Sequence, residues 1–331
     1  MPRGTGSSPP SRLWSNNMQA MTFVSRGLSL FGGKAGRIGA MIRAALSVLG
    51  SDVKVFLPFL LLFLVKAGRG LLALWLLYLG FVTQDWEQAF SLMLLYLVYL
   101  PFEIILQTFL QAMMSQMTRD TLIEGRISWA SIAGVLTRHL FTLLFIGAIS
   151  YFVRRASDSK QEGFFGFLVA LLVFVVAEVW DLVSNFGIAA IVVERAGIKT
   201  IVARLKELRA NVPETLVGVL GIDLVGGVAQ AIFAGGVVLG LFGGGAVGYL
   251  FADQLPQMFL AQFGEVPVNT LPSLAILALS FTVSAFIAAA TVLAKSLYFT
   301  CLYIFANDHK ELPEARSQDL KDALLQGKPE V

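Results

Sequence analysis

The chain has 331 residues, of which 56% are hydrophobic and only 14% charged, and its mean hydropathy is +0.73. Soluble domains carry roughly 25% charged residues, so this composition excludes a soluble globular protein. The net charge of +3 does not indicate nucleic-acid binding, because the basic residues flank apolar runs. A single cysteine, Cys301, excludes an intrachain disulfide, and two histidines make a metal centre unexpected.

Four segments follow one another along the chain. Residues 1–17 are polar, rich in Pro, Ser and Gly and without a signal-peptide core, so they predict a disordered leader. Residues 18–54 predict a basic interfacial helical region. Residues 55–306 hold long apolar runs and predict a transmembrane domain, and residues 307–331 predict a polar cytoplasmic tail.

The apolar runs between residues 55 and 306 are long enough to cross a hydrocarbon core about 30 Å thick as helices. They predict an all-α, polytopic helical bundle, and the lack of alternating strand-length segments argues against a barrel. Short polar links join the spans in pairs, which predicts three antiparallel hairpins. The six predicted spans are Val55–Val82, Gln88–Met114, Ala133–Val153, Phe164–Val193, Thr215 to about Phe242, and Leu271–Phe305.

A stretch of mixed polarity precedes each predicted hairpin. In the third, apolar residues between Ile198 and Leu208 share one helical face, with basic residues around them, which is typical of an interfacial helix. Similar stretches run over residues 21–49 and 127–140. The chain is therefore predicted to repeat an interfacial helix plus a hairpin three times. The alternative is that any loop leading into a span tends to look amphipathic.

Lysine and arginine are distributed unequally between the two sides of this topology. One side holds seven in residues 1–54, three in 119–138, five in 195–209 and four after residue 307, while the other side holds three. Cytoplasmic loops carry the excess of these residues. We therefore expect a multi-pass protein of a prokaryotic inner membrane with both termini in the cytoplasm.

Ionisable residues inside the predicted spans are candidates for functional groups, since each costs at least about 2.5 kcal/mol to insert. In an antiparallel hairpin, residues equally far along the chain from the loop lie at the same depth. In the first hairpin this comparison places Glu103 level with Lys66 and Arg69, which predicts a buried ion pair. Two interpretations remain open: interhelical clamps, or a polar path or pocket for a substrate. The seven residues are Lys66, Arg69, Glu103, Glu178, Asp181, Asp223 and Lys295.

The second hairpin allows the same comparison. Reflection about Asp158 places Glu178 level with Arg138, beside His139, and Asp181 lies one turn further on the same face. In the functional interpretation the basic pair of the first hairpin would attract an anion. The carboxylates of Glu178, Asp181 and Asp223 would then relay protons or bind a cation.

Glycines recur every four residues near the end of the fifth span, at Gly236, Gly240, Gly244 and Gly248. Such a face lets another helix approach to backbone contact, within the chain or across a homo-oligomer; the alternative is a glycine-lined pore. The apolar run 215–252 is about 57 Å long as a helix, too long for one straight span. Either the run tilts and projects beyond the membrane, or it breaks near residues 243–245 into a span plus a re-entrant or interfacial piece. We expect the break, so that residues 235–252 form part of a span, a re-entrant segment or an interfacial piece.

Pro101 interrupts the second span two residues before Glu103. It predicts a kink that turns the carboxylate and freed backbone carbonyls toward one interior. Packing around an ordinary proline kink is the alternative. No motif for a nucleophile, a metal or a phosphate has a fitting context in this sequence, so neither enzyme activity nor a cofactor is expected.

Short motifs at the predicted cytoplasmic ends of the spans form one more pattern. They are Arg119-Asp120, Glu124-Gly125, Ser128-Trp129, Val192-Val193-Glu194, Leu297-Tyr298 and Tyr303-Ile304-Phe305-Ala306. Together they resemble a family of uncharacterised six-span bacterial and archaeal membrane proteins over about residues 40–306. The resemblance implies a membrane bundle and no known activity, so it assigns no functional residue.

These patterns favour a membrane bundle that transports or accommodates a small anionic or amphiphilic molecule, with Lys66, Arg69 and Glu103 lining its interior. One alternative is a non-catalytic structural subunit of a membrane complex, docked through the glycine face and the interfacial helices. Another is a lipid-organising protein whose basic helices bind anionic headgroups. The expected partners are membrane lipids and other subunits or a second copy, and no nucleic acid.

Overall fold

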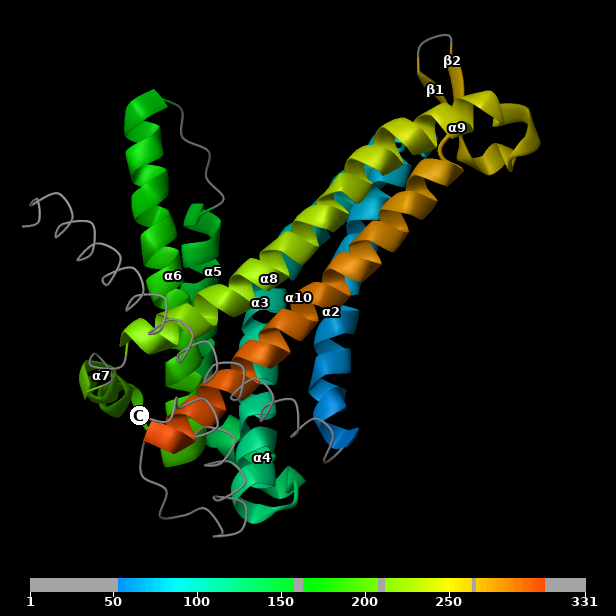
Figure 1. Ribbon diagram of the computed structural model, residues 1–331. Coiled ribbons are helices and arrows are strands. Elements are labelled where there is room, and N and C mark those ends of the chain that lie inside the picture. Colours follow the sequence, from blue (N-terminus) through cyan, green and yellow to red (C-terminus); the bar gives the residue numbers. More distant parts are fainter. Residues whose placement is uncertain (1–52, 158–162, 208–211, 264–265, 307–331) are drawn as a thin grey trace, which may run out of the picture. The chain divides into compact units, whose positions relative to one another are not determined.

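The computed structural model describes residues 53–157, 163–207, 212–263 and 266–306 (Figure 1). Six helices in this part of the chain are long and apolar enough to cross a membrane, which confirms the prediction of an all-α transmembrane bundle. The predicted leader, nearly all of the basic region 18–54 and the C-terminal tail lie outside the described residues. So does the first predicted interfacial stretch, residues 21–49.

The described elements follow the predicted order of spans, with additional short pieces between them. The helices are η1 (Val53–Val55), α2 (Phe56–Tyr78), η2 (Leu79–Thr83), α3 (Trp86–Arg119), η3 (Asp120–Glu124), α4 (Trp129–Arg138), α5 (Leu140–Ser157), α6 (Gly163–Glu194), α7 (Ile198–Glu207), α8 (Val212–Val238), η5 (Leu239–Gly243), α9 (Gly244–Leu250), η6 (Ala252–Gln254), η7 (Gln257–Phe259) and α10 (Leu271–Ala306). Between η7 and α10, strands β1 (Leu260–Phe263) and β2 (Val266–Asn269) pair antiparallel, a hairpin that was not predicted.

The three predicted hairpins are present, because α2 packs on α3, α5 on α6 and α8 on α10. The first hairpin turns tightly: Gln84 adopts a left-handed conformation, and the Asp85 carboxylate accepts a hydrogen bond from the Gln88 backbone N–H to cap α3. Helix α10 also packs along α2, which the sequence did not predict. Phe59 and Phe286 meet edge to face across that contact, with ring centroids 5.4 Å apart.

The third span was predicted to start at Ala133, but the chain makes two helices there. Helix α4 ends at Arg138 and the long helix α5 begins at Leu140, because the backbone leaves helical geometry at His139. The amphipathic stretch before the third hairpin likewise forms a separate helix, α7. Two of the three predicted interfacial stretches therefore form separate helices, α4 and α7.

The predicted break at residues 243–245 is wrong. The fifth span continues from α8 through one π-helical turn, η5, into α9 and ends at Leu250. Figure 1 shows the three pieces running on from one another beside α10. The glycines do not unwind the helix because the backbone keeps its hydrogen bonds through the turn and gains a packing partner in α10.

Three of the four regularly spaced glycines lie against α10, and Gly248 lies against Asn269 at the end of β2. A Cβ at Gly240 would lie 3.0 Å from Leu277, and one at Gly244 would lie 2.6 Å from the Ser273 Cα. Gly236 faces Ser280, and Gly248 faces the backbone carbonyl of Asn269. The whole row therefore packs closely within the chain, against side chains at Gly236 and Gly240 and against backbone atoms at Gly244 and Gly248.

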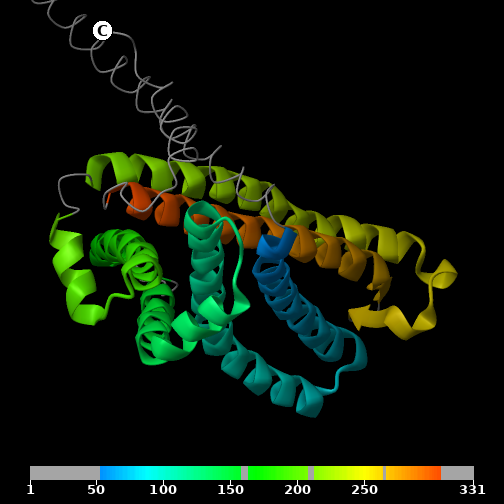
Figure 2. The same cartoon turned by 90° about the horizontal axis from the view of Figure 1, so that it is seen from below.

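Helix α3 runs through Pro101 without interruption and changes direction along its length (Figure 2). It contacts α2, α5, α6 and α10, which makes it the element shared by the first two hairpins and the last helix. Its second half is polar on its buried side, since Glu103, Gln107 and Gln111 recur every four residues. This polar row positions the candidate site.

Candidate functional site

The ion pair predicted in the first hairpin is present. The Lys66 ammonium lies 3.4 Å from Glu103 Oε1, and Arg69 Nη1 lies 3.3 Å from Glu103 Oε2. Glu103 is 1% exposed and Lys66 is 7% exposed, whereas Arg69 is 43% exposed. Two cations thus face one carboxylate, leaving a surplus of one positive charge, and Arg69 keeps part of its guanidinium free of protein contact.

The contacts of this cluster are long for charged groups. Charge-assisted N–H···O contacts are typically about 2.7–2.9 Å, so Glu103 is held loosely by both cations. Lys66 has a closer neutral partner, because its ammonium donates to Gln107 Oε1 at 3.1 Å. The Tyr99 hydroxyl donates to the Val65 carbonyl at 2.6 Å and joins α3 to α2 one turn away.

A cavity of about 300 Å³, the basic cavity, opens beside Lys66 and Arg69. Its wall includes four small residues that leave space for the cavity: Gly70, Ala73, Ala285 and Ala288. Tyr96, Gln230 and Ser284 add polar groups, and Phe281 completes the lining. The cavity therefore combines two cations with neutral hydrogen-bonding groups.

A second charged cluster surrounds Lys295. Its ammonium lies 2.8 Å from Asp181 Oδ2 and 2.5 Å from Asp223 Oδ1, so α10 is tied to both α6 and α8. Asp181 and Asp223 are about one-third exposed, while Lys295 is buried. Glu178 lies one turn before Asp181 and makes no ion pair with any described residue.

A cavity of about 210 Å³, the acidic cavity, lies beside this cluster. Glu178, Asp181, Asp223 and Lys295 line it together with neutral polar groups from α3 and α5 and with the exposed Arg154. The remaining lining residues are Ile104, Gln107, Thr108, Gln111, Ser150, Val153, Ala177, Trp180 and Ser184. All seven ionisable residues predicted within the spans thus belong to the two clusters.

The two cavities are stacked along the same helices. On α8, Asp223 lines the acidic cavity and Gln230 the basic one, two helical turns or about 10 Å apart. On α10, Lys295 and Ala288 have the same relation. Gln107 joins the two levels, since it lines the acidic cavity and accepts the hydrogen bond of Lys66. We call the two cavities and this link the polar column.

The predicted level of Glu178 is wrong. The Trp180 indole N–H donates to the Ser150 hydroxyl at 2.9 Å, which puts Glu178 near Phe152 rather than Arg138. Reflection about Asp158 failed because α6 extends beyond the end of α5 (Figure 1). His139 instead lies outside the spans, where burial, followed by the charges of Arg138 and Arg195, lowers its pKa.

Sequence reasoning overlooked the neutral members of the column, Gln107, Gln111, Gln230 and Ser284. A signal was available for the first two. Gln107 and Gln111 follow Glu103 at intervals of four, so all three share one helical face within an apolar run. Gln230 and Ser284 carry no comparable pattern and are brought to the cavity by the pairing of α8 with α10.

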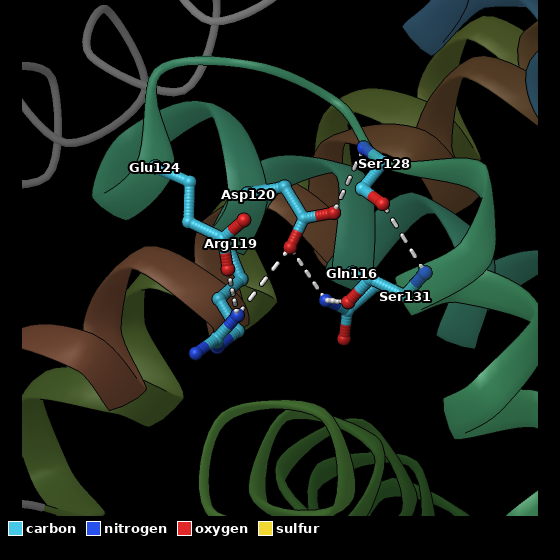
Figure 3. Close-up of polar contacts among 6 residues, drawn as sticks. All are labelled: Gln116, Arg119, Asp120, Glu124, Ser128 and Ser131. Carbon is cyan, nitrogen blue, oxygen red and sulfur yellow. Dashed lines mark hydrogen bonds and ion pairs between the residues drawn. The ribbon is translucent and has the colours of Figure 1, made fainter.

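Outside the column, the densest polar network is the corner between α3 and α4 (Figure 3). Asp120 is fully buried, and its carboxylate accepts hydrogen bonds from the Gln116 amide at 2.6 Å and the Ser128 backbone N–H at 3.3 Å. Arg119 contacts both Asp120 and Glu124. The carboxylate therefore fastens the loop that leads into α4, and several of the motifs behind the family resemblance lie here.

Replacing Asp120 by alanine should destabilise the protein by about 1–3 kcal/mol, since it leaves the Ser128 N–H without its acceptor and the Gln116 amide with Ser131 as its remaining acceptor. Thermal unfolding in detergent would measure the loss. Glu124→Gln is the matched control: Glu124 is 41% exposed, so weakening its pair with Arg119 should change stability little. Equal effects of the two substitutions would contradict this role of Asp120.

The apolar helices and the charged column inside them define a multi-pass integral membrane protein. No family model, curated protein or solved structure matches this chain. The resemblance to a family of six-span membrane proteins therefore stays a prediction.

Proposed function

We propose that this protein transports a small anion across the membrane through the polar column, with Lys66 and Arg69 as the binding groups. The observation that carries the proposal is the basic cavity, which is lined by two cations that share one buried carboxylate, Glu103, within the spans. An intramembrane ionisable group is by default a sign of a substrate or ion pathway. Neither catalysis nor a cofactor forms part of the proposal.

The composition of the basic cavity supports an anion rather than a purely structural clamp. One cation would neutralise Glu103, so the second leaves a positive charge toward the cavity. The walls of Gly70, Ala73 and Ala285 keep the space open. Ser284 and Gln230, which have no hydrogen-bond partner among the described residues, supply donors for an anion. About 300 Å³ is at the lower end of small-molecule sites.

The structural interpretation is the second candidate, because Lys66 and Glu103 are both buried and paired, as in an interhelical clamp. In that case the protein would be a non-catalytic subunit of a membrane assembly. The exposed apolar side chains of α8, among them Leu224, Val225 and Val228, would then face lipid or a partner subunit. For either function we propose a prokaryotic cytoplasmic membrane with both termini inside.

Flux through purified protein in liposomes tests the proposal. Chloride, inorganic phosphate and benzoate serve as probes, each loaded inside and exchanged against the same labelled anion outside. Arg69→Gln should lower exchange of the transported probe severely with little change in thermal stability, because Arg69 is half-exposed. Arg126→Gln, at an exposed arginine outside the column, is the control and should keep wild-type exchange.

Two results would overturn the proposal. One is exchange no faster than in protein-free liposomes for all three probes while the protein unfolds cooperatively. The other is wild-type exchange by Arg69→Gln. A loss of folded yield in Arg69→Gln with unchanged flux per folded molecule would support the clamp instead.

A further inference from the structure

We propose that the acidic cavity is a proton-binding site, that Glu178 carries the proton, and that this proton moves together with the anion held in the basic cavity. The inference rests on the proposed function. It assigns a driving ion to the transporter and a separate role to each level of the polar column.

The charges of the acidic cavity are unbalanced. Three carboxylates, those of Glu178, Asp181 and Asp223, face the single buried ammonium of Lys295. Lys295 is shared by the two aspartates at 2.8 and 2.5 Å, and Glu178 forms no ion pair among the described residues. Like charges that share a site cannot all remain ionised at low cost. One proton on Glu178 would reduce the surplus negative charge.

The groups facing Glu178 come from every helix around the cavity. Its own helix α6 presents Asp181, α8 presents Asp223, and α10 presents Lys295. Helix α5 contributes the exposed Arg154, whereas α3 contributes only neutral side chains. Glu178 is therefore the carboxylate whose neutralisation breaks no ion pair.

A second observation points to an occupant in this cavity. Gln111 is only 9% exposed, lines the cavity, and makes no hydrogen bond with any described residue. Its amide atoms are open to the cavity, where a hydrated or protonated group would form hydrogen bonds with them.

The link between the two levels explains how the proton and the anion could move together. The Lys66 ammonium, which lines the basic cavity, donates to Gln107, which lines the acidic one. Protonation of Glu178 removes one negative charge from the other level of the column, so it weakens the repulsion that an entering anion meets. A proton taken from water on one side and released on the other balances the anion's charge.

The test uses a proton gradient as the driving force. Wild-type liposomes with an inward proton gradient should accumulate the transported probe anion, and a pH-sensitive dye inside should report acidification. Glu178→Gln keeps a polar side chain of the same size. It should lose both gradient-driven accumulation of the anion and dye acidification. Glu124→Gln, an exposed carboxylate outside the column, should retain both.

Infrared difference spectra between neutral and acidic pH provide a readout that needs no transport. The wild type should show the C=O band of a protonated carboxyl group that Glu178→Gln lacks and Glu124→Gln keeps. The inference is overturned if the band persists in Glu178→Gln, or if that variant still accumulates the anion from a proton gradient. Absence of exchange in the wild type would instead overturn the proposed function, and the infrared result would still decide the proton site.

Discussion

Replacing Glu103 by alanine should destabilise the bundle by about 3–5 kcal/mol, because it leaves the buried ammonium of Lys66 without a negative partner. Gln107 remains as a neutral acceptor at 3.1 Å and offsets part of the loss. Unfolding in mixed detergent micelles, followed by circular dichroism against denaturant, would measure the change. Among single substitutions in the two charged clusters, this one should have the largest effect on stability.

The double variant Lys66→Met with Glu103→Leu is the informative companion. Removing both buried charges at once leaves no unpaired ion, so most of the stability should return. The anion site would nevertheless be lost, and exchange in liposomes should fall to background. Stability as low as that of Glu103→Ala would contradict the account of the pair, whereas full stability with wild-type exchange would refute the binding role of Lys66.

Gly244→Ala should destabilise the protein by about 1–3 kcal/mol, because the added Cβ would lie 2.6–2.7 Å from backbone atoms of Ser273. Backbone atoms cannot swing aside as a flexible side chain can, so α9 and α10 would have to separate. Gly248→Ala should have an effect at least as large, since its Cβ would overlap the Asn269 carbonyl. Thermal unfolding and folded yield after purification would measure both.

Gly245→Ala is the matched control on the next residue of the same helix. Nothing lies within 4 Å of a Cβ at this position, and alanine favours a helix by about 1 kcal/mol over glycine. Gly245→Ala should therefore be neutral or slightly stabilising. Equal destabilisation by Gly244→Ala and Gly245→Ala would show that glycine is needed for flexibility and not for close packing.

Distance from the turn correctly predicted the depth of Glu103 in the first hairpin but not that of Glu178 in the second. Glu103 meets Lys66 because a tight turn at Gln84 and Asp85 joins two helices whose paired lengths are nearly equal. Glu178 was misplaced because α6 extends past α5, so the middle of the polar link is not the middle of the hairpin. Depth can be read from sequence only where the turn itself is local and short.

The glycine row was also predicted correctly only in part. Its four-residue period predicted a face for close helix packing, and three of its glycines do pack closely against α10. The expected unwinding at residues 243–245 did not occur, because hydrogen bonds in a π-helical turn and contacts with α10 stabilise the helix there. A run of glycines allows a helix to unwind. Whether it does so depends on the helix packed against it, here α10.

Hydropathy and local charge were enough to predict the spans, the three hairpins and the seven charged residues, since each depends on residues close together in the chain. The packing of α10 on α2 and the placing of Lys295 between Asp181 and Asp223 depend on contacts across more than 70 residues. A glycine-rich or charged face on a predicted helix shows that the helix needs a packing or ion-pair partner. Which helix is that partner depends on how all the helices pack together in the tertiary structure.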